Sequence, residues 1–146
     1  INDALTHVDK VLIEEMISGR EVECGVLGSK ASAIGEIKIL GNHEFYDFEA
    51  KYLDDATKLI VPAEIPEEVA NQIRAYAIQA FNLIGAEGLA RVDFFLKPDG
   101  SLVLNEINTM PGFTPTSMYP RLWQASGITY QNLITELIKL AQKKVK

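Results

Sequence analysis

Two apolar runs joined by a four-residue turn place the strongest constraint on how this chain folds. The turn is Lys97–Gly100, with Pro98 at its second position and Gly100 at its fourth, where a type I turn favours these residues. The runs on either side are rich in Val, Leu, Ile and Phe. The pattern predicts a β-hairpin, and because both of its faces carry apolar residues, we expect both to be covered.

The register of this hairpin decides which side chains lie together. If the two ends of the turn face each other, Arg91 lies opposite Glu106 and Asp93 lies opposite Leu104. Because side chains alternate along a strand, Asn108 then joins the three charged residues on one face. A one-residue slip, or a bulge at the turn glycine, would change this pairing. The apolar residues divide between the faces, with Phe95, Leu102 and Leu104 beside the charged residues and Val92, Phe94, Leu96, Val103 and Ile107 opposite.

Two carboxylates, an amide oxygen and a guanidinium at one end of a sheet have two interpretations. The simpler one is a salt bridge between Arg91 and Glu106 on a half-exposed sheet. The other is a magnesium site, because Mg²⁺ takes hard oxygen ligands, a few from protein and the rest from phosphate and water. Asp93, Glu106 and Asn108 supply such oxygens. Arg91 would neutralise phosphate oxygens beside them, and the residues alone leave both interpretations open.

Composition and charge exclude several classes of protein. The chain has 146 residues, of which 47% are hydrophobic, and this is enough for one domain with a core. A net charge of −6 without a basic patch argues against nucleic acid binding. No apolar run approaches the roughly 20 residues of a membrane span, and no signal-peptide pattern is present. We therefore expect a cytoplasmic protein that binds neither nucleic acid nor a membrane.

Three further strands are predicted before the hairpin. Lys10–Ile17 is a short apolar run that predicts a buried strand, ended by Ser-Gly. Residues 20–27 alternate between polar and apolar, and residues 31–40 alternate again, which predicts an antiparallel pair. The single cysteine, Cys24, excludes an internal disulfide and suits the cytoplasm. Its place in the alternation predicts a buried strand residue rather than a nucleophile.

Three helices complete the prediction, at residues 66–84, from about 117 to 126, and from Thr129 towards the end of the chain. Pro66 suits the first position of a helix, and Gly85 follows as a stop. The first and last helices have apolar stripes, so we assign them packing only. Together the elements indicate an α+β fold, with a mostly antiparallel sheet of about five strands backed by the Pro66 and Thr129 helices.

Residues 41–62 show neither a strand period nor a helix period. They hold Phe45, Tyr46 and Phe48 close together, which disordered tails seldom do. A loop of this length inside a compact domain is usually functional or mobile, so we predict a functional loop.

The hairpin and the residues after it carry a resemblance to a known family. Arg-Val-Asp at 91–93 and Asn-Glu-Ile-Asn-Thr-Met-Pro-Gly-Phe-Thr at 105–114 resemble the metal- and phosphate-binding end of the ATP-grasp ligases. Within them the chain is most similar to the D-alanine–D-alanine ligases, from about Val11 to its end. The two motifs are specific when they occur together in this order. The resemblance therefore favours the magnesium site over a simple salt bridge.

The resemblance implies a C-terminal ATP-grasp domain that binds two Mg²⁺ (or Mn²⁺) ions. The implied metal ligands are Asp93, Glu106 and Asn108. It implies that Arg91 and the N–H of Gly112 hold a tetrahedral oxyanion. It also implies that Ser117 lies at the carboxylate of the second D-alanine, at a helix N-terminus. A plain helix cap at Thr116 or Ser117 is compatible with this role.

The same resemblance implies an ATP site. The residues implied at the adenine are Glu14, Glu15, Met16 and Ile17, of which the last two could be ordinary core residues. The family often has Lys where Glu15 stands. Glu21 is implied to accept hydrogen bonds from the ribose, although by itself it would be a solvated strand residue. The 41–62 loop resembles an ω-loop lid, in which Lys51 would reach a phosphate and Tyr52 would hydrogen-bond towards the wall that carries Glu21.

The implied reaction is the ATP-dependent ligation of two D-alanines to the dipeptide used in peptidoglycan synthesis. A related carboxylate–amine ligase or a D-alanine–D-lactate ligase stays possible, and Tyr52 favours an amine acceptor. A nucleotide-binding module without chemistry is the third interpretation. Residues 1–10 are expected to be the tail of a preceding ATP-grasp subdomain, and residues 11–146 the catalytic domain. The family binds its first D-alanine through an N-terminal part, so we expect the fragment alone to be inactive and the complete enzyme to be a homodimer.

Overall fold

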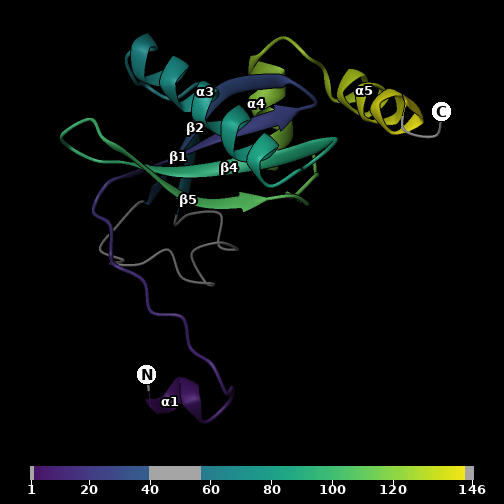
Figure 1. The fold of residues 1–146 in the computed structure, drawn as a ribbon. Helices are drawn as coiled ribbons and strands as arrows, with labels where there is room; N and C mark the ends of the chain where they lie inside the picture. Colours follow the sequence, from purple (N-terminus) through teal and green to yellow (C-terminus); the bar gives the residue numbers. More distant parts are fainter. Residues whose placement is uncertain (1, 40–56, 144–146) are drawn as a thin grey trace.

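An antiparallel sheet of five strands forms the centre of the described structure (Figure 1). The structure is a computed structural model that describes residues 2–39 and 57–143. The strands are β1 (Arg20–Leu27), β2 (Lys30–Ile39), β3 (Thr57–Ile60), β4 (Leu89–Leu96) and β5 (Leu102–Asn108). Their order across the sheet is β3-β2-β1-β4-β5. The predicted α+β fold with a mostly antiparallel sheet is confirmed.

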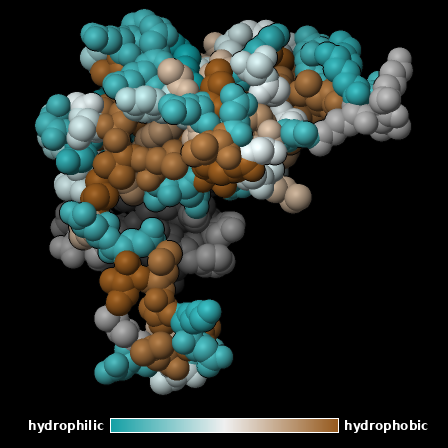
Figure 2. Space-filling view, viewed as in Figure 1, coloured by the Kyte–Doolittle hydropathy of each residue, from teal (hydrophilic) through white to brown (hydrophobic). Residues whose placement is uncertain are grey.

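One predicted strand is absent from this sheet, and another takes its place. The predicted run at Lys10–Ile17 lies in an extended stretch between α1 and the sheet (Figure 1), and Leu12 is 80% and Met16 is 74% exposed. Figure 2 shows hydrophobic residues on the surface of this part of the molecule. The buried strand predicted there is wrong for this structure, because no described strand pairs with the run. The fifth strand is β3, which pairs with β2 inside the region predicted as loop. The predicted lid at 41–62 therefore overlaps β3, and residues 40–56 lie outside the described residues.

Helix α3 covers one face of the sheet. The described helices are α1 (Asn2–Leu5), α3 (Glu67–Leu83), α4 (Met118–Ala125) and α5 (Tyr130–Lys143). The buried residues between α3 and the sheet include Ile73, Ala77 and Phe81 from the helix and Val22, Cys24, Val26, Val92 and Phe94 from the strands. Pro66 takes the N-cap position, just before the first helical residue. Among the described helices, none combines the length and the hydropathy that a bilayer crossing demands.

The single cysteine lies in this core, as the alternation of its strand predicts. Cys24 is fully buried and forms no disulfide. Burial raises the pKa of its thiol to about 12, so the thiolate that a nucleophile needs is not formed near neutral pH.

Helix α4 covers part of the other face, and α5 packs against α4. One buried cluster joins the two helices to the end of β1: Leu27, Tyr119, Trp123 and Leu133. The prediction that the Thr129 helix backs the sheet is therefore corrected, because α4 occupies that position. Helix α4 comes close because Gly35 of β2 has no side chain. A Cβ atom there would lie 2.7 Å from the sulfur of Met118 and 2.8 Å from Cδ2 of Leu122.

The hairpin of β4 and β5 has a different register from the one predicted. Arg91 faces Asn108 and Asp93 faces Glu106. The predicted pairs, Arg91 with Glu106 and Asp93 with Leu104, are wrong.

Two one-residue shifts explain the difference. The turn closes between Lys97 and Ser101, where the Lys97 N–H donates to the Ser101 carbonyl at 2.9 Å. A bulge after Asp93 adds the second shift. Because side chains alternate with a period of two, each shift reverses the faces and two shifts restore them. The polar residues therefore share one face as predicted, whereas Leu102 and Leu104, which lie between the shifts, point to the other face.

Candidate active site

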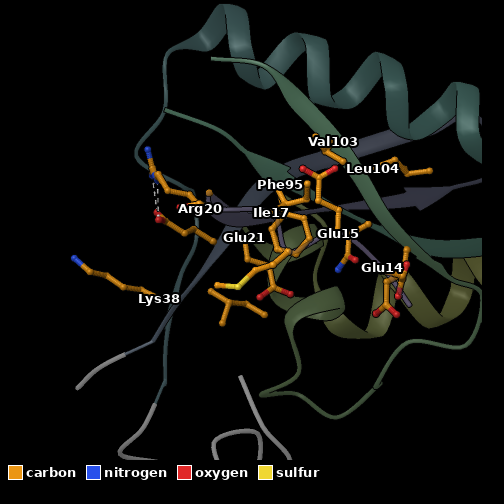
Figure 3. Close-up of a pocket in the computed structure, with 16 residues that line it drawn as sticks. Glu14, Glu15, Ile17, Arg20, Glu21, Lys38, Phe95, Val103 and Leu104 are labelled. Atoms are coloured by element: carbon orange, nitrogen blue, oxygen red, sulfur yellow. Dashed lines mark hydrogen bonds and ion pairs between the residues drawn. The ribbon is translucent and has the colours of Figure 1, made fainter. Parts of the chain in front are cut away.

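An open pocket of about 950 Å³ lies against the sheet at the start of β1 and the end of β2 (Figure 3). Residues 14–21 form one side of it, residues 36–38 form another, and Phe95 with residues 103–106 forms a third. Its size is in the range of small-molecule sites, which are about 300–1,000 Å³.

The structure brings the nucleotide residues implied by the resemblance together in this pocket. All five described ones line it: Glu14, Glu15, Met16, Ile17 and Glu21. The alternative that Met16 is a core residue is wrong here, since its side chain is exposed. Lys51 and Tyr52 lie outside the described residues, so their predicted roles stay predictions.

Phe95 and Val103 line the pocket, although the reasoning from sequence assigns neither of them to a site. Phe95 points into the pocket next to Ile17 (Figure 3), and Val103, its register partner on β5, lies beside it. The sequence does contain a signal for Phe95, because it follows Asp93 by two residues and so shares its face. Val103 is predicted on the opposite face and reaches the pocket only through the shifted register.

At the rim of the pocket, Arg20, whose side chain is 42% exposed, forms an ion pair with the buried Glu36. Arg20 donates from Nε and Nη2 to the two carboxylate oxygens of Glu36, at 2.8 and 2.6 Å. Its Nη2 also donates to the carbonyl of Glu64 at 3.1 Å. The hydrogen bonds from Arg20 lower the pKa of Glu36, which keeps this carboxylate charged. The pair ties the start of β1 to β2 where the two strands border the pocket.

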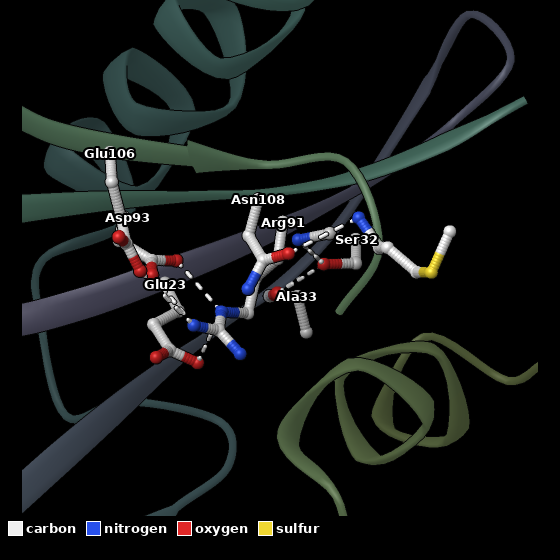
Figure 4. A network of polar contacts seen from close by, with 9 residues as sticks. Glu23, Ser32, Ala33, Arg91, Asp93, Glu106 and Asn108 are labelled. Carbon is white, nitrogen blue, oxygen red and sulfur yellow. Dashed lines mark hydrogen bonds and ion pairs between the residues drawn. The ribbon is translucent and has the colours of Figure 1, made fainter. Parts of the chain in front are cut away.

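Arg91 is the centre of a charged cluster on the sheet (Figure 4). Its Nε and Nη2 donate to the two oxygens of Asp93 at 2.9 and 2.8 Å. Its Nε also lies 3.3 Å from Glu23, and its Nη2 lies 3.7 Å from Glu106. Among the described residues, three carboxyl groups thus share one guanidinium.

Glu23 is the functional candidate that reasoning from sequence missed. It is 1% exposed and faces Asp93 across β1 and β4. Neither of its carboxyl oxygens accepts a hydrogen bond from a described residue. Burial raises its pKa to about 8, and the charge of Asp93 adds to the shift, against the effect of Arg91. An acidic residue in an alternating strand normally faces solvent, so only the pairing of β1 with β4 shows that this one is enclosed.

The predicted metal ligands lie together but are not arranged around an ion. Asp93 and Glu106 face each other across the hairpin, and Asn108 follows on the same face. Both Asp93 oxygens accept hydrogen bonds from Arg91, and the Asn108 side-chain oxygen accepts one from the Met110 N–H at 3.1 Å. Across the described residues, no three His, Cys, Asp or Glu side chains are grouped as a metal site.

The chemistry of these donors nevertheless fits a magnesium ion. All three are hard oxygen donors. Burial raises the pKa of Asp93 even though Arg91 hydrogen bonds lower it, so one guanidinium does not fully compensate the enclosed acids. Because Glu23 adds a buried carboxyl group without a hydrogen-bond donor, a divalent cation would complete the charge balance.

The loop before α4 carries the last two predicted residues. Ser117 takes the N-cap position of α4, but its hydroxyl makes no capping hydrogen bond to the helix. It bonds the backbone N–H and the hydroxyl of Thr114 instead, at 3.1 and 2.8 Å. Gly112 lies close by, since a Cβ atom there would lie 3.1 Å from the Ser117 hydroxyl. Ser117 therefore does not cap the helix through its side chain. The backbone N–H groups at the N-terminus of α4 donate to no capping side chain.

The pocket and the charged cluster are continuous. Glu21 and Glu23 are two residues apart on β1, and Phe95 and Asp93 are two apart on β4, so each strand contributes to both regions from one face. Glu106 lines the pocket and also contacts Arg91. A ligand that fills the pocket would therefore lie next to the Arg91 cluster.

Comparison with known proteins assigns this arrangement to a family. A family model described as "D-ala D-ala ligase C-terminus" matches residues 1–139. The chain belongs to this family. A D-alanine–D-alanine ligase from Pseudarthrobacter chlorophenolicus is 54% identical over 149 residues, covering 97% of this chain and 39% of the relative. The ligase from Acetivibrio thermocellus is 59% identical over 136 residues, covering 90% and 36%.

Solved structures of the ligase family agree with the described fold. The D-alanine–D-alanine ligase of Coxiella burnetii has a TM-score of 0.81 at 39% identity, covering 98% of this chain and 37% of that one. The Bacillus anthracis ligase complexed with ATP has a TM-score of 0.75 at 32% identity, covering 89% and 42%. The chain thus spans well under half the length of these ligases.

Proposed function

We propose that this chain is the nucleotide- and metal-binding part of an ATP-dependent D-alanine–D-alanine ligase that supplies the dipeptide for peptidoglycan synthesis. The observation that carries the proposal is the continuity of the open pocket with the Arg91 cluster, with Glu106 in both. Family membership and an ATP complex of one relative support it.

The pocket is suited to the nucleoside part of ATP. Phe95 and Val103 supply an apolar contact for adenine, and residues 14–17 supply backbone groups for its edge. Glu21 lies on the same side of the pocket, where its carboxylate could accept hydrogen bonds from ribose hydroxyls. The phosphates would then extend towards Arg91.

The cluster would hold the phosphates and two Mg²⁺ (or Mn²⁺) ions. We assign Asp93, Glu106 and Asn108 as metal ligands because they present hard oxygens on one face. Held by these residues, the ions would supply Lewis-acid chemistry to the phosphate groups. Arg91 neutralises charge beside them, and the N–H of Gly112 would help to hold a tetrahedral oxyanion.

The reaction forms an amide and releases ADP and phosphate. The carboxylate of the first D-alanine takes the γ-phosphoryl group of ATP, the amine of the second attacks the acyl carbon, and phosphate leaves. Ser117 and the N-terminus of α4 would receive the carboxylate of the second D-alanine, because a helix N-terminus favours an anion. We propose that the rest of the ligase, as a homodimer in the cytoplasm, supplies the site for the first D-alanine.

The lid residues are part of this proposal, although they lie outside the described residues. Lys51 would contact a phosphate, and Tyr52 would help to seat the closed lid and so exclude water and other acceptors. Replacing Tyr52 by Phe in a complete ligase is expected to admit D-lactate as acceptor, and an unchanged preference for D-alanine would reduce Tyr52 to packing.

The function is tested in a complete ligase that contains this domain, by D-alanine-dependent phosphate release and dipeptide formation. Phe95→Ala should raise the KM for ATP about tenfold, as expected for a lost aromatic contact with a base, and leave the KM for D-alanine unchanged. Tyr76→Ala removes an exposed aromatic residue of α3 and serves as the matched control. ATP binding without dipeptide formation would favour a non-catalytic module, and an unchanged KM for ATP would remove adenine from this pocket.

A further inference from the structure

The proposed function leaves the buried residue Glu23 without a role. It is a large and fully enclosed acidic side chain, and it accepts no hydrogen bond from a described residue. Burying an acid without a donor is costly, so a fold that keeps one there needs a use for it. The charged group within reach is the guanidinium of Arg91, whose Nε lies 3.3 Å away.

In this structure Arg91 hydrogen-bonds to Asp93 and not to Glu23. Its Nε–H and Nη2–H point at the two oxygens of Asp93, which explains why Glu23 is near enough for an ion pair but receives no hydrogen bond. Arg91 and Asp93 thus occupy each other in a two-point contact. Under the proposed function, the oxygens that Arg91 covers are those that a metal ion needs.

A metal ion at Asp93 would repel the guanidinium that is bound to the same two oxygens, so Arg91 would gain from another acceptor. Glu106, at 3.7 Å, is a second proposed ligand and is not available for that role. Glu23 lies on the other side of Arg91, on β1, and belongs to no ligand set (Figure 4). A small rotation of the guanidinium would turn its Nε–H from Asp93 to Glu23.

We propose that Glu23 is a positioning residue for Arg91, the enclosed acid that holds its guanidinium when Asp93 binds the metal ion. The inference rests on the proposed function for the presence of the metal site. Arg91 would then stay beside the phosphates without competing for the ligands. Since Glu23 acts through Arg91, it need not touch metal, nucleotide or substrate.

A double-mutant cycle on metal affinity tests the proposal in a complete ligase carrying this domain. Mn²⁺ binding is measured directly from the spin-resonance signal of the free ion, with no substrate present. Glu23→Gln keeps the shape of the side chain and should weaken Mn²⁺ binding about tenfold, in the range of couplings between contacting residues. In an Arg91→Met background, the same substitution should change Mn²⁺ affinity less than twofold. If the tenfold loss persists there, Glu23 acts on the metal directly and the proposal is overturned.

Glu67→Gln is the charge-matched control. Glu67 pairs with Arg74 on α3 at 2.8 Å, so this variant also removes one acid from an arginine, away from the site. It should leave Mn²⁺ affinity unchanged. Glu23→Asp keeps the charge on a shorter side chain and should recover part of the lost affinity, whereas a purely structural role would make it no better than Glu23→Gln.

A measurement on the unmodified ligase covers the case in which the Glu23 variants do not fold. The Arg91 Nε–H resonance, assigned by its absence from Arg91→Met, should shift when Mg²⁺ is added, because its acceptor changes. A resonance that does not move at saturating Mg²⁺ would show that Arg91 stays on Asp93 and would overturn the proposal. If the unmodified ligase binds no Mn²⁺ and forms no dipeptide, the proposed function fails; if it does both and Glu23→Gln binds Mn²⁺ normally, only the role of Glu23 fails.

Discussion

Arg91 interacts with three carboxyl groups among the described residues, and the distances rank them. Asp93 holds the hydrogen bonds at 2.8–2.9 Å, Glu23 follows at 3.3 Å, and Glu106 lies at 3.7 Å. Arg91 therefore makes its shortest contacts with side chains of the site itself. Binding of a phosphate group and a divalent ion would change which carboxyl groups Arg91 contacts. We therefore expect each carboxyl group to have its own effect on metal binding.

Removing single ligands tests this at the residue scale. The variants are Asp93→Asn, Glu106→Gln and Asn108→Ala in a complete ligase. Each should raise the Mg²⁺ concentration needed for half-maximal turnover and lower the maximal rate, because each removes an oxygen donor or its charge. Asp99→Asn, at the exposed turn of the same hairpin, should behave as unmodified. A Mg²⁺ titration that is the same for all three variants would rule out the metal assignment.

At the scale of elements, the site depends on how closely β1, β2 and α4 approach. The pairing of β1 with β4 places Glu23 beside Asp93, and α4 brings Ser117 towards Gly112. The close packing of α4 on β2 needs a strand residue without a side chain, and Gly35 is that residue. The elements that carry the chemistry are therefore placed by contacts outside the charged cluster.

Gly35→Ala tests the close approach of α4. Its Cβ would lie within 2.8 Å of Leu122, so we expect overpacking and a loss of about 1–3 kcal/mol in the free energy of unfolding, measured by urea denaturation. A displaced α4 should also raise the KM for the acceptor D-alanine more than the KM for ATP. Unchanged stability would mean that α4 yields without cost and does not define the acceptor side.

The Arg20–Glu36 pair gives a stability that depends on pH. Arg20 lowers the pKa of Glu36 below its ordinary value of 4.5. A carboxyl group of this kind binds protons more readily in the unfolded chain, so its contribution is fully present above about pH 4.5 and is lost as the pH falls through its folded value. Glu36→Gln should therefore be less stable than the unmodified protein at pH 7, and the difference should shrink towards pH 3. A difference in the free energy of unfolding that stays constant between pH 7 and pH 3 would contradict this account. Glu67→Gln, which removes a more exposed ion pair, should change the free energy of unfolding little.

At the scale of the whole molecule, the described structure presents apolar residues that nothing in it covers. Leu12, Ile13 and Met16 are 70–80% exposed along the stretch that leads from α1 to the sheet. Exposed apolar groups of this kind mark surfaces that contact another part of a protein. The ligases that the chain matches are more than twice as long, and we propose that their additional residues supply this contact.

The chain of 146 residues is expected to bind ATP weakly and to release no phosphate with D-alanine. Positioning two reactants can lower a barrier by about 7–11 kcal/mol, and under the proposed function the rest of the ligase supplies the site for the first D-alanine. Isothermal titration with ATP and a phosphate-release assay check the two expectations on the purified chain. Turnover close to that of a complete ligase would contradict the proposal that the rest of the ligase holds the first D-alanine.

Local patterns in the sequence determined the hairpin, two of the other three strands of the sheet, and the helices. These elements could be predicted because each depends on periodicity and end signals within a short stretch of sequence. Examples are the turn at Lys97–Gly100, and Pro66 and Gly85 on either side of α3. The grouping of Arg91 and Asp93 with Glu106 and Asn108 on one face is of the same kind. It survives the wrong register because two one-residue shifts cancel in a pattern of period two.

Only the tertiary structure decided the features that depend on distant partners. The apolar run at 11–17 has the composition of a strand, but a strand also needs a neighbour, and the described sheet offers it none. Glu23 has the pattern of a solvated residue and is enclosed because β4 pairs beside it. The seat of α4 depends on the missing side chain of Gly35, eighty-three residues before Met118. Burial and register follow from contacts between remote segments, which a window of neighbouring residues does not contain.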